Sequence, residues 1–413
     1  MTNATWPRLT LKTTEVKRMG MPDKVIASFA AKEDVGTPVR LSLAAFSNDY
    51  IFVDFGDGNI VNKALHYDFS IVEGKLGKNR EVKFYTYSES PVSLRVFSVT
   101  DFAMNSVDLS QMPDVECINL SNAYLKEIDL SHNLKLKELS LAGNRLSSLD
   151  LSKHTALTLL SLNNCGVKSL DLSAQKELTW LNISSLGLES VDLSAQSKLK
   201  WLSVSDNKFK TIDLSALTSL REFYASGNQL ETLNLDNQPD MAYVNLAKNH
   251  FKFSTFPYHN INNLAYTDQA DVEVKAVNGT VDISSEARVN NFPTEYKWVT
   301  VGGTELVKGS DYTIQDGVTT FLTTPEEDVI CEMTNGFFPE LILKTVAMPV
   351  EAYGGIESIA ADANAEVRVY DLSGVLVRRF CGSDATTEDL APGFYIIETF
   401  AGDNRSVSKI RVK

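Results

Sequence analysis

The 413-residue sequence lacks any run of about 18 apolar residues, the length that a helix needs to span a bilayer. We therefore do not expect an integral membrane protein. Basic residues are in the minority: 39 Lys and Arg stand against 53 Asp and Glu, a formal net charge of −14, and they form no cluster. Nucleic acids and anionic membranes both require a clustered basic field, so neither is an expected partner.

Cysteine and histidine are scarce, which limits metal and redox chemistry. The four cysteines are scattered singly, without a C-x-x-C pattern or a disulfide framework: Cys117, Cys165, Cys331 and Cys381. The five histidines are dispersed, and no H-E-x-x-H, G-x-S-x-G or Gly-rich phosphate motif occurs. We predict free thiols, no metal, no cofactor, no catalytic residue and no enzyme activity.

The sequence does contain a short phrase that is repeated in strict register. Asp-Leu-Ser begins at positions 108, 129, 150, 171, 192 and 213, and Asn-Leu-Asp follows at position 234. Each start lies 21 residues after the last one. A fixed period of this length is typical of a solenoid, in which each repeat contacts only its neighbours.

The unit that begins at Asp129 reads DLSHNLKLKELSLAGNRLSSL, and its second half resembles the leucine-rich repeat pattern L-x-x-L-x-L-x-x-N/C-x-L. Its leucines recur as apolar residues in almost every copy, so we expect them to point inward. An internal Asn is expected to bond loop backbone, but this column is interrupted by Ala123, Cys165 and Leu186. We expect looser loops near Leu186.

The L-x-L segment of each repeat is the predicted strand, and alternation turns three of its positions outward onto the curved inner face. Packing fixes the inward positions, so we expect function in the outward ones. In the fourth to seventh repeats these positions combine aromatic residues with Ser and Asn. The candidate ligand-binding residues are Trp180, Asn182, Trp201, Glu222, Tyr224, Tyr243 and Asn245.

Two interpretations of this aromatic patch remain open. Exposed rings among small hydrogen-bonding residues suit recognition of a sugar or an extended peptide. Alternatively, the rings only stack along the array and stabilise it. On the opposite, convex side the Asp and Ser of each repeat can bond local backbone amides, and a row of calcium ions along the Asp residues is the less favoured alternative.

Before the array, residues 8–106 show the alternating or short apolar runs that are typical of β-strands. The cluster Asp54-Phe55-Gly56-Asp57-Gly58 resembles the turn of polycystic-kidney-disease-type β-sandwich modules of bacterial surface proteins. We favour a plain hairpin here over a calcium site at Asp54 and Asp57, because the spacing lacks the full set of oxygen ligands.

After the array, the apolar run at 251–257 predicts a C-terminal cap. From Asp271 to about Met348, short strands alternate with turn pairs such as Asn278-Gly279. This alternation is typical of an immunoglobulin-like sandwich, and Trp298 is its expected core aromatic residue.

The last segment carries three motifs: V-Y-D-x-x-G-x-x-V at 369–377, L-x-x-G-x-Y at 390–395 and K-x-x-x-K at 409–413. Together they resemble the C-terminal sorting domain recognised by the type IX secretion system. The whole order of segments resembles bacterial surface leucine-rich repeat proteins of the adhesin type. This resemblance implies a Gram-negative protein at the outer-membrane surface or secreted. The N-terminal residues lack a secretory signal, so either the protein is intracellular or its leader peptide is absent from the sequence.

We therefore predict a mainly β protein, a leucine-rich repeat solenoid of about seven 21-residue units flanked by β-sandwich domains. The expected domains are 1–106, an N-terminal cap; 107–262, the array with its C-terminal cap; 263–348, an immunoglobulin-like sandwich; and 356–413, a sorting-like tail. The predicted function is non-enzymatic binding of an extracellular protein or glycan. The alternative is a structural spacer or envelope assembly component with no foreign ligand.

Overall fold

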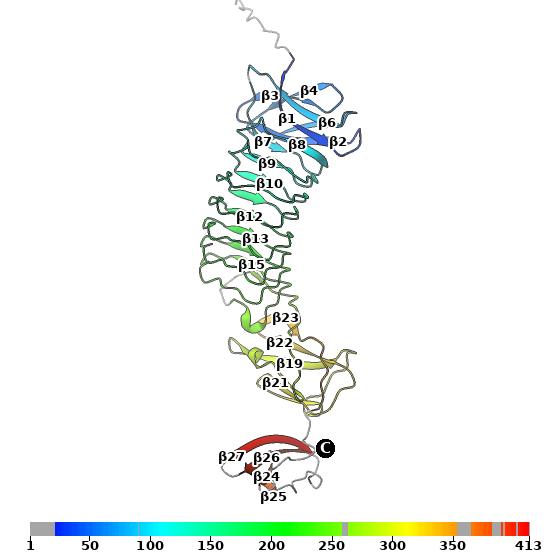
Figure 1. The fold of residues 1–413 in the computed structure, drawn as a ribbon, viewed down its shortest axis with the longest axis vertical. Helices are drawn as coiled ribbons and strands as arrows, with labels where there is room; N and C mark the ends of the chain where they lie inside the picture. The colour runs from blue at the N-terminus through cyan, green and yellow to red at the C-terminus, as the bar shows by residue number, and fades with distance from the viewer. Residues whose placement is uncertain are drawn as a thin grey trace, which may run out of the picture. The chain divides into compact units, whose positions relative to one another are not determined.

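The computed structural model describes residues 21–89, 91–257, 263–352, 365–381, 390, 393–401 and 404–412 (Figure 1). The features predicted at residues 1–20, at 391–392 and at Lys413 lie outside these ranges. The chain divides into two compact units, Met1–Ala225 with Asn234–Tyr243, and Ser226–Leu233 with Val244–Lys413. Within the described residues, no helix is long and apolar enough to cross a membrane.

Two antiparallel sheets form the N-terminal region of the first unit. One has the strand order β4-β3-β6-β1-β8, and the other begins β5-β2-β7. Alternate residues are buried, as in Phe84 and Val82 of β6, so the sheets share a core. The strands are β1 (Lys24–Ala31), β2 (Pro38–Ala45), β3 (Asp49–Asp54), β4 (Ile60–Leu65), β5 (Ser70–Lys75), β6 (Glu81–Thr86), β7 (Leu94–Ser98) and β8 (Met104–Asp108).

Strand β7 joins this region to the array. It pairs in parallel with the first repeat strand, with Val96 aligned with Cys117 and Phe97 with Ile118. The segment after β7 also follows the repeat path, because the amide of Val99 donates to the carbonyl of Asn119 at 2.9 Å. The solenoid therefore begins one turn earlier than the sequence motif predicts. The sequence motif does not reveal this first turn, because no Asp-Leu-Ser precedes β7.

The array itself is a ladder of short parallel strands. Each pairs with the next in register, as Leu139 of β10 does with Leu160 of β11. Leu136, Leu139 and Leu141 are 0% exposed, which confirms that the repeated leucines point inward. The predicted leucine-rich repeat solenoid is confirmed. The strands are β9 (Cys117–Asn119), β10 (Glu138–Ser140), β11 (Leu159–Ser161), β12 (Trp180–Asn182), β13 (Trp201–Ser203), β14 (Glu222–Tyr224) and β15 (Tyr243–Asn245).

Buried amides link the repeats behind the strands. Asn207 donates from Nδ2 to the carbonyls of Ile183 and Val204, at 2.9 and 2.8 Å. Its Oδ1 accepts the amides of Leu186 and Leu188 at 3.1 and 3.0 Å. The sequence predicted looser loops near Leu186, but the loop there is held by Asn207 of the following repeat.

A second buried polar column lies behind the Asp-Leu-Ser turns, and the sequence reasoning did not identify it. Gln196, for example, donates from Nε2 to the carbonyl of Leu172 at 2.7 Å, although its side chain is fully buried. The members each bond backbone of the preceding repeat: Asn133, His154, Gln175, Gln196 and Gln238. The sequence does contain a signal for this column: an amide side chain recurs four residues after the first residue of the turn.

In the second unit, the repeat path continues beyond Asn249. The side chain of Gln269 donates from Nε2 to the carbonyls of Leu246 and Tyr266, both at 2.9 Å, which repeats the role of an internal Asn. It follows the short strand β16 (Asn263–Ala265). The predicted cap at 251–257 contains the 3-10 turn η1 (Phe253–Thr255), with Phe253 buried.

The following region contains a three-stranded sheet, β17-β21-β20, and a four-stranded sheet, β18-β19-β22-β23. Trp298 is 0% exposed, and its Nε1 donates to Oγ1 of Thr319 at 3.1 Å, so its predicted place in the core is confirmed. The elements are β17 (Thr280–Asp282), η2 (Ser284–Glu286), β18 (Arg288–Val289), β19 (Phe292–Thr300), β20 (Tyr312–Gln315), β21 (Val318–Phe321), β22 (Val329–Asn335) and β23 (Phe338–Lys344).

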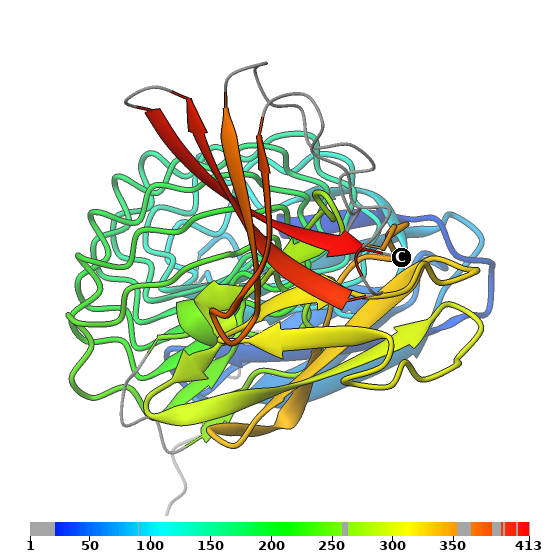
Figure 2. The ribbon, with the colours of Figure 1, turned by 90° about the horizontal axis from the view of Figure 1, so that it is seen from below.

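The last strands form an antiparallel sheet of order β25-β24-β26-β27, whose strands lie side by side in Figure 2. Val367, Val369 and Ile397 form its buried cluster with Leu390 and Tyr395. The strands are β24 (Glu366–Asp371), β25 (Leu376–Cys381), β26 (Gly393–Ala401) and β27 (Asn404–Val412).

Candidate functional site

The predicted site residues lie at the ends of the repeat strands, where alternation turns them away from the core. The middle residues of β12, β13 and β14 are Leu181, Leu202 and Phe223, and all three are 0% exposed. Five of their six neighbours are half-buried: Trp180, Asn182, Trp201, Glu222 and Tyr224; the sixth, Ser203, is 6% exposed. Tyr243 begins β15 and is half-buried too. We call this outward surface of the repeat strands the strand face.

Four aromatic rings on the strand face form one continuous row, which we call the aromatic ladder. Trp180 and Trp201 stack with ring centroids 4.3 Å apart and planes 8° apart. Trp201 lies 5.1 Å from Tyr224, and Tyr224 lies 4.9 Å from Tyr243, with tilts of 38° and 33°. The sequence predicted that these residues are neighbours, and the structure brings all four together.

Tyr224 keeps the ladder continuous where the first outward column holds Glu222 instead of a ring. Its hydroxyl donates to Oε2 of Glu222 at 2.9 Å, which holds the phenol in place. Burial, and then the bond to Glu222, raise the pKa of Tyr224, while contact with Trp201 opposes this rise. Glu222 therefore acts on the ladder by positioning a ring.

The Ser and Asn side chains next to the ladder bond nearby backbone amides or one another. Oδ1 of Asn182 accepts the amide of Ser184 at 3.1 Å, and the hydroxyls of Ser184 and Ser203 lie 2.7 Å apart. Oδ1 of Asn245 accepts the amide of Ala247 at 3.1 Å within the second unit. These side-chain oxygens therefore already have partners within the strand face.

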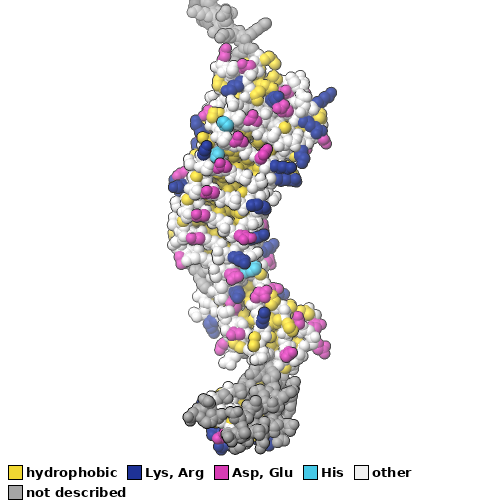
Figure 3. Space-filling view, viewed as in Figure 1, with side chains coloured by type: hydrophobic (Ala, Val, Ile, Leu, Met, Phe, Trp, Pro, Cys, Tyr) yellow, Lys and Arg dark blue, Asp and Glu magenta, His cyan; other side chains and the backbone are white. Residues whose placement is uncertain are grey.

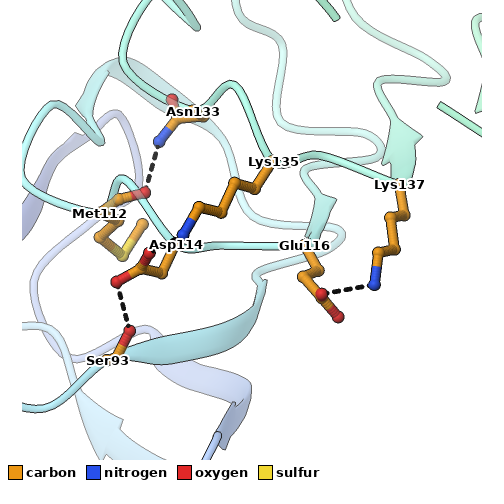
Figure 4. Close-up of polar contacts among 7 residues, drawn as sticks. All are labelled: Ser93, Met112, Asp114, Glu116, Asn133, Lys135 and Lys137. Carbon is orange, nitrogen blue, oxygen red and sulfur yellow. Dashed lines mark hydrogen bonds and ion pairs between the residues drawn. The ribbon is translucent and has the colours of Figure 1, made fainter. Parts of the chain in front are cut away.

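Ion pairs beside the strands follow the 21-residue period. Lys137 bonds Glu116 at 2.5 Å, and Lys135 bonds Asp114 at 2.6 Å, in each case across one repeat (Figure 4). Lys198 pairs with Glu177 in the same way, at 2.6 Å.

Lys200 departs from this rule. The residue 21 positions before it is Thr179, which has no charge, and Lys200 has no ion pair within the described residues. Its side chain is exposed, and it directly precedes Trp201. Among the described residues, Lys200 is thus a cation without an ion pair that directly precedes a ring of the aromatic ladder in the chain.

The structure shows how the predicted calcium candidates are used. Oδ1 of Asp54 accepts the backbone amides of Gly56, Asp57 and Gly58 at 2.8, 3.1 and 3.0 Å, and β3 pairs with β4 around this turn. This is the predicted plain hairpin. Among the described residues, no group of three or more His, Cys, Asp or Glu side chains is arranged to hold a metal ion.

The described thiols are free, as predicted, at Cys117, Cys165 and Cys331; the side chain of Cys381 is outside the described part. Cys117 lies on the strand face. Burial raises the pKa of its thiol to about 12, with a further contribution from Glu138. The thiol is therefore protonated and unreactive at neutral pH.

The charges on the molecular surface are mixed. On the face shown in Figure 3, acidic and basic side chains are interspersed along the array, without a broad basic field. This distribution agrees with the net charge of −14 and with the absence of a clustered basic segment in the sequence.

Comparisons with known proteins give likenesses of fold. No family model and no curated protein matches the chain. Among solved structures, it is similar to the functional domain of InlJ from Listeria monocytogenes, with 14% identity over 62% of this chain and 90% of that one and a TM-score of 0.23. It is also similar to the leucine-rich repeat domain of APL1B, with 16% identity over 53% and 84% and a TM-score of 0.32. A third likeness is to the Toll–Spatzle complex of Drosophila, with 13% identity over 40% and 28% and a TM-score of 0.33.

Proposed function

We propose that this chain is a non-enzymatic binding protein of the cell surface or secreted fraction, which recognises an extracellular protein or glycan through the strand face of its repeats. The observation that carries the proposal is the aromatic ladder from Trp180 to Tyr243. Aromatic residues are the commonest energetic centres of binding surfaces, and here four of them are contiguous and half-buried.

The scaffold around the ladder supports this role. The inward leucines are fully buried, so their substitution would cost packing energy. The outward side chains lie outside this core. A solenoid that holds its outward side chains on paired strands presents them at fixed spacing, which lowers the entropy cost of binding.

The surface location is part of the proposal and rests on the sequence. The three motifs at 369–377, 390–395 and 409–413 resemble the sorting domain of the type IX secretion system. The described part of this region is a small antiparallel sheet with its own buried cluster, which suits a separate terminal module.

Binding arrays test the proposal. Wild-type protein and the Trp201→Ala and Tyr243→Ala variants would be applied to arrays of extracellular proteins and glycans. We expect a ligand whose binding falls by about tenfold or more in both variants. The matched control is Tyr124→Ala, since Tyr124 is an exposed aromatic residue outside the ladder and contacts Arg145. A ligand that binds all four proteins equally would contradict the proposed site.

A further inference from the structure

The aromatic ladder presents the edges of its rings to solvent. The planes of Trp180 and Trp201 are 8° apart and their centroids 4.3 Å apart, close to the separation of neighbouring strands, about 4.8 Å. These two rings therefore stack along the array and cover each other's faces, and Tyr224 and Tyr243 continue the row with tilts of 38° and 33°. A sugar ring packs flat against an exposed aromatic face, so this arrangement disfavours a glycan as the occupant of the ladder.

The edges of aromatic rings can contact a ligand backbone whose carbonyl groups have no internal hydrogen bonds. The edge of an aromatic ring carries positive partial charge, which attracts carbonyl oxygens. In a polyproline II helix the carbonyl groups have no internal partners and remain available to such edges. Aromatic surfaces recognise this helix in several domain families, because its conformation is preformed and costs little entropy to bind.

The spacing of the ladder decides between two kinds of extended peptide. The ring steps are 4.3, 5.1 and 4.9 Å, so alternate rings lie roughly 9–10 Å apart, two repeats of the array. One turn of polyproline II, three residues, covers about 9.3 Å. In a β-strand, side chains on one face repeat every two residues, about 6.6 Å. This distance matches neither the spacing of adjacent rings nor that of alternate rings.

The charge next to the ladder adds a second requirement. Lys200 is exposed and directly precedes Trp201, and unlike Lys137 and Lys198 it has an uncharged residue, Thr179, 21 positions before it. The carboxylate of Glu222, on the next repeat, is bonded to the hydroxyl of Tyr224. A ligand that lies along the ladder would bring its own side chains close to this cation. An acidic side chain in the ligand supplies the missing counter-charge.

We propose that the aromatic ladder binds a proline-rich segment of a partner protein in the polyproline II conformation, with an acidic side chain of that segment paired with Lys200. The inference rests on the proposed binding function and deepens it by naming the class of ligand. The rings supply the apolar contact and the register, and Lys200 selects for negative charge.

Peptide binding to the full chain tests the inference by fluorescence anisotropy. The main probe is a labelled decapeptide of eight prolines and two glutamates. The comparison probes are the same peptide with lysines in place of glutamates, and a Gly-Ser decapeptide with two glutamates that does not form polyproline II. Chitohexaose serves as the glycan competitor. We expect binding of the first peptide that is at least tenfold tighter than that of the other two, without competition by chitohexaose.

Three variants locate the binding. Trp201→Ala is expected to weaken the proline–glutamate peptide by about 30-fold. Lys200→Glu is expected to weaken it by about fivefold at low salt and to reverse the preference in favour of the lysine peptide. The matched charge control, Lys168→Glu, changes an exposed residue outside the repeat strands and is expected to have no effect.

The outcomes separate the inference from the proposed function. Equal binding of the Gly-Ser and proline peptides, or no binding of the proline peptide, would overturn the polyproline inference. Ladder-dependent binding of chitohexaose would overturn it too, while supporting the ladder as a binding site. If the proline peptide binds and Trp201→Ala leaves its affinity unchanged, the inference is overturned and the ladder loses its role in the proposed function as well.

Discussion

His154 shows how one side chain departs from the chemistry of its column. Its Nε2 lies 3.1 Å from the carbonyl of Leu130, so it donates one bond to the preceding repeat. Gln175 and Gln196 occupy the same position in later repeats, and each donates two hydrogen bonds to backbone carbonyls. His154 is 2% exposed, and its Nδ1 has no partner among the described protein atoms, as is also the case for Oε1 of Gln175 and Gln196; the difference lies in the number of bonds donated. A buried polar atom without a partner lowers stability.

We predict that His154→Gln raises the free energy of unfolding by about 1 kcal/mol, because the amide can donate to two carbonyls as Gln175 does. His154→Leu removes the bond to Leu130 and should lower this free energy by about 1–3 kcal/mol. Urea denaturation of the two variants and wild type measures both effects. A Leu variant as stable as wild type would show that the bond contributes little, as the natural Leu217 in this column permits.

Asn207 gives a second prediction at this scale. Its side chain bonds two carbonyls and two amides of buried loops. Asn207→Leu keeps the volume but leaves these groups without partners, so we expect a loss of about 2–4 kcal/mol of unfolding free energy in the same denaturation experiment. Asn182→Leu, on the half-exposed strand face, is the control and should cost less than half as much.

At the scale of the element, the Asp-Leu-Ser turns repeat one local bond. The amide of each Ser donates to Oδ1 of the Asp two residues before it, at 2.8–2.9 Å in six repeats. In the seventh, Oδ1 of Asn234 accepts the amide of Asp236 at 2.7 Å, so an amide side chain can make the same turn. The sequence predicted these turns because their partners are only two residues apart.

These turns make the array sensitive to acid. Bonds from the Ser amide lower the pKa of the turn Asp below its ordinary value of 3.8, as at Asp171, Asp192 and Asp213. A lowered pKa in the folded state contributes stability above about pH 4, and this stability is lost as the pH falls through the folded pKa. We expect the melting temperature of wild type to drop as the pH falls below about 4.

Replacing these three Asp residues by Asn tests the cause. Asn keeps the acceptor oxygen, as Asn234 shows, but does not titrate. The triple variant should therefore melt near the wild-type temperature at pH 7 and lose less melting temperature than wild type on acidification. Parallel pH curves for the two proteins would show that the acid sensitivity arises elsewhere.

The aromatic ladder was predictable from the sequence only in part. Register places Trp180, Trp201 and Tyr243 in one outward column, and this follows from the period alone. The inclusion of Tyr224 from the next column, and its bond to Glu222, depend on side-chain rotation that a repeat alignment does not contain. The orientation of the rings, edge outward, likewise depends on their mutual stacking.

At the scale of the whole molecule, the end of the array and the two-sheet region that follows it share a core in the second unit. Phe338 of β23 lies 6.1 Å from Phe253 and 4.9 Å from Phe256, both in the predicted cap. Glu286 is 0% exposed and accepts bonds from the amide and hydroxyl of Ser254, at 2.9 and 2.6 Å. The sequence placed a domain boundary between these segments, and contacts between residues so far apart in the chain leave no local pattern that could reveal the packing.

This shared core predicts that a change in the four-stranded sheet β18-β19-β22-β23 loosens the array end. Phe338→Ala removes a buried ring from the contact with Phe253 and Phe256, at a cost of about 3–5 kcal/mol. We expect faster amide hydrogen exchange at residues 251–257, measured by mass spectrometry. The control is Ile342→Ala on the same strand, because Ile342 is 56% exposed and should leave the exchange unchanged. Unchanged protection at 251–257 in Phe338→Ala would mean that the array end is stable without this contact, because a hydrogen-bonded turn then opens independently of the ring that covers it.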